Sequence, residues 1–388
     1  MCASVRPELV SRNDKRLIER DLRLKHHIPY SLIRLLPGLK KVRLQNRLKQ
    51  FSMMYKDKEF DNEPDEYQVV SQTIRELMEE LGYASPIIEK VNSVMNAQLA
   101  YSEADDEYRE HFIHPFQVFL LGIIIIDRHY PLFENGFSSE LLTDNRTSME
   151  STWFLASVFH DHIKPIKPLL HLARSIIRSR SEESTRTDDI PDRTELMYSI
   201  GRAHKMLVNS TQLQKNLNLW SVDPQFLSVL EEYAIKENHG VIAGLNVLDW
   251  IRNLGVVNPT DAAAALAIAL HDGDYQNKRA FPMALLRTGI LPIDSARNPV
   301  AFLLLWCDAI QEWGRWTHRN PADIKLLDVT FENCTIKVRL SFDNEKAIDL
   351  KKVEFQHVEG CLLNPILTFK RDLRIHPPGL GLRKRTTR

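Results

Sequence analysis

The sequence predicts a mainly α-helical protein that ends in a small β-rich domain. From about residue 96 to 320, apolar residues recur every three to four positions, which is the period of a helix. Beyond Pro321 apolar and polar residues alternate, which is typical of strands. We therefore expect a helical N-terminal region at 1–95, a helical core domain at 96–320, and a β-rich domain with a basic tail at 321–388.

Composition limits the class of protein. The chain has 388 residues, 43% hydrophobic and 26% charged, so it can bury the cores of two or three domains. Its formal net charge is zero, so no overall field draws it to nucleic acid or membrane. The N-terminus lacks the apolar segment of a signal peptide, and the longest apolar run, 118–126, is too short to cross a bilayer. Four cysteines without CxxC spacing predict neither a zinc site nor a disulfide framework, and we expect a cytoplasmic protein.

The charge of the N-terminal region is uneven. Residues 1–50 contain 13 Lys and Arg against 4 Asp and Glu, whereas residues 51–110 contain 5 against 15. Either these two segments pack on each other, or the first binds an anionic partner.

Local patterns predict the elements that flank the core domain. Amphipathic helices should break at Pro29 and at Pro37-Gly38, and a helix should run from Tyr67 to near Gly82. We expect 57–66 to be a solvated acidic linker and 178–195 to be a surface loop. In the C-terminal domain we expect a hairpin at 325–342 that turns at Glu332-Asn333, followed by strands at 351–360 and 365–375.

Six side chains within or at the ends of apolar helical stretches predict a site. They are, in chain order, His114, His160, Asp161, His239, His271 and Asp308. Imidazoles and carboxylates are costly to bury unless something satisfies them, and each residue alone is more simply a cap or a satisfied core residue. Together they favour a shared metal centre, and this mixture of nitrogen and oxygen ligands suits Zn, Mn, Fe or Mg.

The order His…His-Asp…Asp resembles the HD superfamily of metal-dependent phosphohydrolases over roughly residues 100–320. The two intervening histidines make the chain similar to the two-metal branch of that superfamily, which includes the HD-GYP phosphodiesterases. The resemblance implies an all-helical domain with two divalent metal ions held between helices. It places His114, His160, Asp161 and Asp308 on the first ion and His239 and His271 on the second, with Asp161 bridging the two.

The same resemblance adds Lys164 to the site. In HDHIK, Lys164 matches the lysine of the HD-GYP motif HDxGK, where it would hold the substrate phosphate and act in catalysis with Asp161. Ile163 replaces the glycine of that motif, no GYP sequence occurs, and Asp272 follows His271 where HD-GYP proteins carry paired histidines.

Further candidates come from spacing alone. Arg315 lies seven residues after Asp308 on the same helical face and would either bind the substrate phosphate or form a salt bridge at a helix end. His111 is an alternative ligand to His114, one helical turn before it, and Glu312 would orient a ligand or pair with Arg315. The remaining candidates are expected to lie outside the metal ligand set: His162, Asp272, Asp274, and the core tryptophans Trp306, Trp313 and Trp316.

The expected activity is hydrolysis of a phosphoester, in a nucleotide or nucleotide-derived small molecule, by a water that two metal ions activate. One alternative is an HD-type nuclease that acts on single strands, with the basic N-terminal region and the basic C-terminal tail as contacts to the nucleic-acid backbone. Another is a ligand-sensing HD module without turnover. A homo-oligomer is compatible with all three, and no membrane partner is expected.

Overall fold

In the computed structural model, the described part of the protein is mostly helical, with a three-stranded sheet near the C-terminus. The structure describes residues 28–57, 63–89, 91–92, 95, 113–137, 145–162, 238–254, 259–271, 293–294, 299–311, 325–342, 344–363, 365 and 367–375. The helices are α2 (Tyr30–Ile33), η1 (Leu36–Gly38), α3 (Gln45–Asp57), α4 (Glu63–Leu81), α6 (Ile113–Arg128), α7 (Tyr130–Phe137), α8 (Asn145–Phe159), α13 (His239–Leu254), α14 (Pro259–His271), α16 (Pro299–Ile310) and α17 (Glu345–Gly360). The strands are β1 (Ile293–Asp294), β2 (Lys325–Glu332), β3 (Thr335–Phe342), β4 (Leu362–Leu363) and β5 (Thr368–Ile375). The predicted fold class is confirmed at this coarse level.

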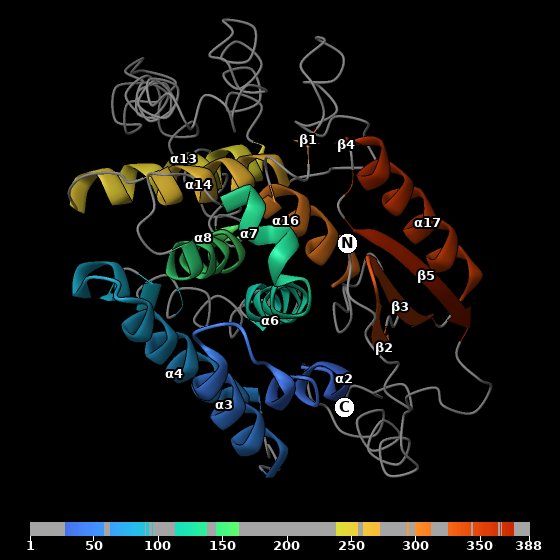
Figure 1. Ribbon diagram of the computed structural model, residues 1–388, viewed down its shortest axis with the longest axis horizontal. Coiled ribbons are helices and arrows are strands. Elements are labelled where there is room, and N and C mark those ends of the chain that lie inside the picture. Colours follow the sequence, from blue (N-terminus) through green and yellow to red (C-terminus); the bar gives the residue numbers. More distant parts are fainter. Residues whose placement is uncertain are drawn as a thin grey trace, which may run out of the picture.

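Figure 1 shows α6, α8 and α16 at the centre of the molecule, with α13 and α14 above them, α3 and α4 at the lower left, and α17 with β3 and β5 on the right. The sequence explains which helices lie in the middle. Every residue of α6 from Ile113 to Asp127 is buried, and so is every residue of α16 except Asp308. A helix that is apolar on all sides must be surrounded by other elements.

The N-terminal layer is attached to this centre through buried carboxylates. The backbone N–H groups of residues 40, 41 and 42 donate to one oxygen of Asp127, at the end of α6, over 2.9, 2.5 and 3.1 Å. The N–H groups of residues 43 and 44 donate to the two oxygens of Glu150, on α8, over 2.6 and 3.2 Å. Buried carboxylates with several donors are well satisfied, so this loop fixes the layer on α6 and α8.

The predicted helix boundaries of the N-terminal region are confirmed in part, and the predicted linker is partly wrong. The stretch before Pro29 lies outside the described residues, and Pro37-Gly38 ends the short helix η1. Helix α2 begins directly after Pro29, and Gly82, with a φ of +81°, follows the end of α4. However, α4 begins at Glu63, inside the acidic stretch that was expected to be a solvated linker, and Glu66 is buried. The phenol of Tyr55, on α3, donates to Glu66 and so satisfies this buried carboxylate.

Part of the uneven N-terminal charge is paired inside the chain. Arg47 on α3 lies 3.2 Å from Glu76 and 3.5 Å from Glu80, both on α4. Arg34, after α2, lies 2.5 Å from Asp328 on β2. The described residues thus include contacts between the basic segment and the acidic one, as one of the two expected arrangements requires.

The C-terminal sheet has the order β2-β3-β5, with β2 and β3 antiparallel and β5 parallel to β3. The hairpin is confirmed, with Asn333 in its turn at a φ of +48°, and β5 lies inside the predicted strand at 365–375. The strand predicted at 351–360 is wrong, because these residues belong to α17. The side chain of Asn344 caps this helix by accepting from the N–H of Ala347, and a parallel partner for β3 requires such a crossover.

Aromatic side chains join the C-terminal sheet and α17 to the helical centre. The ring of Trp306, on α16, stacks on Phe369 of β5 with centroids 4.3 Å apart and lies 5.9 Å from Phe355 of α17. The predicted core role of Trp306 is therefore confirmed. Because α16 also carries Asp308, this packing holds one of the candidate ligands in place.

Two further findings bear on the sequence predictions. Cys334, in the turn between β2 and β3, is disulfide-bonded, which the cysteine spacing did not predict, whereas Cys307 and Cys361 are free thiols. In the described part of the chain, none of the helices combines the length and hydrophobicity that crossing a membrane requires.

Replacing Asp127 tests the attachment of the N-terminal layer. Asp127→Ala leaves three backbone N–H groups without their acceptor, so we expect the free energy of unfolding to fall by about 2–4 kcal/mol. Denaturant titration measures the loss, and Asp349→Ala, at an exposed position of α17, is the control that should change stability little. A loss no larger than that of the control would show that this loop does not anchor the layer.

Candidate metal centre

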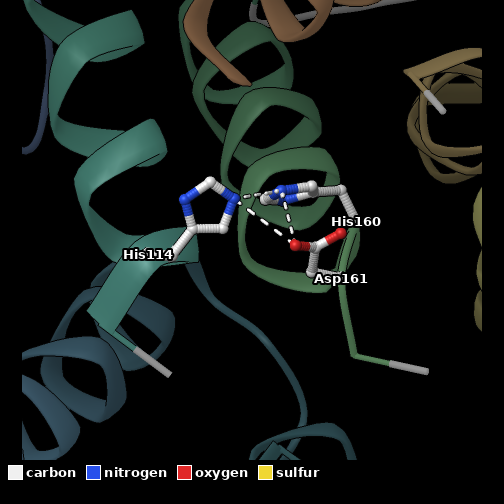
Figure 2. Close-up of side chains that lie close together, drawn as sticks. All are labelled: His114, His160 and Asp161. Carbon is white, nitrogen blue, oxygen red and sulfur yellow. Dashed lines mark hydrogen bonds and ion pairs between the residues drawn. The ribbon is translucent and has the colours of Figure 1, made fainter. Parts of the chain in front are cut away.

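All six predicted ligands lie at helix ends that meet at one place. His114 is the second residue of α6, and His160 and Asp161 directly follow the last residue of α8. His239 begins α13, His271 ends α14, and Asp308 lies in the last turn of α16. In Figure 2 the imidazole of His114 points from α6 across to His160 and Asp161 at the end of α8.

Four of the ligand atoms surround one point. The Nε2 atom of His114 lies 3.0 Å from Oδ1 of Asp308, 3.1 Å from Nε2 of His160 and 3.4 Å from Oδ2 of Asp161. The Nε2 atom of His160 lies 3.4 Å from Oδ1 of Asp308 and 3.7 Å from Oδ2 of Asp161. Two atoms bound at about 2.1 Å to one ion lie about 3.0 Å apart at a right angle and about 3.4 Å apart at a tetrahedral angle. The observed distances fit ligands of a single ion.

The other oxygen of Asp161 faces a second pair of histidines. Its Oδ1 atom lies 3.5 Å from Nε2 of His239 and 3.4 Å from Nε2 of His271. The two imidazole rings lie 5.1 Å apart between centroids. Asp161 therefore presents one oxygen to each of two histidine pairs, which is the arrangement of a carboxylate that bridges two ions.

Backbone carbonyls fix the tautomers of two of these histidines. The Nδ1 atom of His160 lies 2.7 Å from the carbonyl oxygen of Ser157, and that of His271 lies 2.5 Å from the carbonyl oxygen of Ile268. A carbonyl can only accept, so Nδ1 carries the proton and Nε2 carries a lone pair. Oriented and basic Nε2 atoms of this kind are the usual metal ligands.

The carboxylates and imidazole lone pairs of the site favour a bound cation. Burial lowers the pKa of His271, so its ring is neutral and its lone pair faces a carboxylate oxygen. Although burial acts to raise the pKa of Asp308, the close approach of His114 and His160 holds it well below the usual range, so Asp308 is a carboxylate. Asp161 is fully buried. Lone pairs and carboxylates that face one another repel unless a cation lies between them, so these residues fit a bound metal ion.

The helix ends add to this preference. Helices α8, α14 and α16 bring their C-terminal ends to the site, whereas α6 and α13 bring their N-terminal ends. A C-terminal end carries about half a negative charge and stabilises a cation by roughly 0.3–1 kcal/mol at an exposed site. The excess of C-terminal ends therefore favours a metal ion over an anion directly at the ligands.

The six side chains of the centre differ in their exposure to solvent. The side chains of His114, His160, Asp161 and His271 are at most 1% exposed, whereas those of His239 and Asp308 are 18% and 21% exposed. A small molecule that reaches the site would therefore approach past His239 and Asp308.

The structure brings together all six predicted metal ligands. Three overlapping groups, each with ligand atoms within 4.8 Å of one another, contain these six residues and no other described residue: His114, His160 and Asp161; His160, His271 and Asp308; Asp161, His239 and His271. The other candidates Lys164, Arg315, His111, Glu312, Asp272 and Asp274 lie outside the described residues, as do Trp313 and Trp316.

His162 lies beside the centre but points elsewhere. It is buried, its Nδ1 atom lies 2.5 Å from the carbonyl oxygen of Phe159, and its ring lies 4.7 Å from that of Trp250. It belongs to none of the three groups of candidate ligands, in agreement with the sequence prediction.

Sequence reasoning missed the groups that support the ligands. The carbonyls that hold His160 and His271 lie three residues before each of them. A histidine at the end of a helix is the sequence signal that could have predicted these contacts. It also missed Gln117 and Gln311, each three residues after a ligand on α6 or α16, whose buried amides hydrogen-bond to each other. Nothing in the sequence pairs these two glutamines.

Comparisons with known proteins found no significant match to this chain among protein-family models, curated proteins or solved structures.

Removing metal tests the centre without an assay of activity. An ion that binds the folded protein at one hundred times its dissociation constant stabilises it by about 2.7 kcal/mol. We therefore expect a chelator to lower the melting temperature and Mn²⁺, Fe²⁺ or Zn²⁺ to restore it. Asp161→Asn should lose most of this response, because the bridging charge is gone. A melting temperature that changes neither with chelator nor with added metal would contradict the assignment.

Proposed function

We propose that the protein is a hydrolase of phosphoester bonds that uses two divalent metal ions. The observation that carries this proposal is the bridging position of Asp161, with Oδ2 near His114 and His160 and Oδ1 near His239 and His271. When bound, a pair of divalent ions clamps phosphate oxygens and lowers the pKa of a water. The resemblance to the HD superfamily supports the same reaction class.

The charge of the ligand set supports an anionic substrate. It offers two carboxylates, Asp161 and Asp308, and four histidines, of which His271 has its pKa lowered by burial. Two divalent ions bring four positive charges, and the carboxylates offset two of them. The loaded centre therefore keeps a net positive charge, which a phosphoester would neutralise.

The protein's own residues have separable tasks in this proposal. Asp161 would hold both ions, and His160 and His271, whose rings are fixed by backbone carbonyls, would each direct Nε2 toward one of them. His239 and Asp308, the two partly exposed ligands, would meet the substrate as it enters. Lys164, by resemblance, and Arg315, by its spacing from Asp308, would hold the phosphate and steady its charge during the reaction.

A small-molecule substrate, such as a nucleotide, is favoured over a nucleic-acid strand. Arg34 and Arg47, which belong to the basic segment, pair with acidic residues of this same chain. Their charges are therefore partly offset before any phosphate backbone arrives. The partial exposure of two ligands favours an enzyme over a closed sensing module, because catalytic metal sites keep an open position.

A phosphoester screen tests the activity. We expect the metal-loaded protein to hydrolyse bis(p-nitrophenyl) phosphate, and then to prefer one member of a panel of mononucleotides, dinucleotides and cyclic dinucleotides. Asp161→Asn should lower kcat/KM at least about a hundredfold. Asp328→Asn replaces another buried aspartate, paired with Arg34, and should leave kcat/KM within about twofold. Equal activity of the two variants would refute the role of Asp161.

The salt dependence of binding separates the two kinds of substrate. We expect weak association with single-stranded RNA or DNA at physiological salt, with a shallow decline of affinity as salt rises. Fluorescence anisotropy of labelled oligonucleotides measures the affinity at physiological salt and its change as salt is added. Tight binding with a steep salt slope, accompanied by metal-dependent cleavage, would favour the nuclease instead.

A further inference from the structure

We propose that Gly244 is a positioning residue for the second ion, because its contact with α14 sets the spacing between His239 and His271. Separate contacts set the spacing of the first ion's other ligands, so binding of each ion can be weakened separately although both share Asp161. This inference rests on the proposed two-metal function and adds how the centre is loaded.

The ligands of the second ion belong to a pair of antiparallel helices. His239 is the first residue of α13 and His271 the last residue of α14, and the two helices run side by side (Figure 1). Their imidazoles can meet, at 5.1 Å between centroids, only while the two helix axes stay at one separation. The Nε2 atom of His271 is buried without a hydrogen-bond partner and faces Asp161, which marks it as a ligand position.

Gly244 sets that separation. A Cβ atom at this position would lie 2.4 Å from the carbonyl oxygen of Ala265 and 3.1 Å from the Cβ atom of Ala269, both on α14. The first contact is with backbone, so α13 itself would have to move away. Small side chains on the facing surface of α14 complete this close approach.

Among the described elements, α13 packs mainly on α14. Trp250 of α13 also contacts the end of α8, where its ring lies 5.6 Å from Phe159 and 4.7 Å from His162. A shift of α13 would therefore displace His239 and leave α6 and α16, which carry His114 and Asp308, in place.

The first ion's ligands depend on a different glycine. A Cβ atom on Gly122, in α6, would lie 1.9 Å from a ring atom of Trp153, in α8. The indole N–H of Trp153 donates to the carbonyl of Phe119 over 3.0 Å, so the ring is held where it is. This contact sets the distance between α6 and α8, and thus between His114 and His160.

Two matched substitutions test the inference by metal titration of the full chain. Mn²⁺ or Zn²⁺ binding, followed by calorimetry, should show two steps in the wild type. The step that is lost in His114→Ala is binding of the first ion, and the step that is lost in His239→Ala is binding of the second. Gly244→Ala should weaken the second step about tenfold or more and leave the first within about twofold. Gly122→Ala should weaken the first step and leave the second nearly unchanged. Combining Gly122→Ala with Trp153→Phe removes the clash and should restore the first step.

The electron paramagnetic resonance spectrum of bound Mn²⁺ provides a readout that general destabilisation would not give. The wild type should show the signal of two coupled ions, and Gly244→Ala should show the signal of a single ion. If Gly244→Ala does not fold, Ala269→Val crowds the same contact and should show the same selective loss. Equal weakening of both steps in the two glycine variants would overturn the inference while leaving the two-metal function standing. A wild type that binds no metal would instead refute the proposed function.

Discussion

The architecture depends on one buried carboxylate. Asp161 is fully buried, and its two oxygens face different histidine pairs at 3.4–3.7 Å. A charge in that position is tolerable when cations or donors surround it. Three of the four histidines that face it come from helices other than α8, which leads to Asp161: His114 from α6, His239 from α13 and His271 from α14. Four helix ends therefore converge on Asp161, and α16 brings Asp308 to His114 and His160 beside it.

The outer layers hold these central helices in position. The loop at 40–44 binds Asp127 near the end of α6 that lies away from the candidate ligands, and Glu150 in the first half of α8, also away from them. At the other side, Trp306 of α16 packs on the C-terminal sheet. Neither contact touches a ligand, yet each fixes a helix that carries one. The parts of the chain that flank the helical domain thus contribute to the geometry of the centre.

The sequence predicted which six side chains meet better than it predicted the elements around them. Ligands reveal themselves because a polar residue such as Asp308 inside FLLLWCDAI has no reason to be buried without a partner. Helix α17 was predicted as a strand because VEFQHV alternates locally, whereas its buried residues, among them Ile348, Lys351, Phe355 and Val358, follow a helical spacing over a longer window. The carbonyl of Ser157 and the pair of Gln117 and Gln311 were missed because tertiary contact alone brings them to the site.

The distribution of ligands among the helices has a chemical consequence. In the proposed centre, the first ion would have His114, His160, Asp161 and Asp308 as ligands, whereas the second would have His239, His271 and the shared Asp161. Fewer protein ligands leave more coordination positions for water or substrate. Each position has one partly exposed ligand, Asp308 at the first and His239 at the second. In a two-metal hydrolase built this way, the number of ligands rather than their exposure would distinguish the two ions, and the second would be held less firmly and leave more room for the substrate.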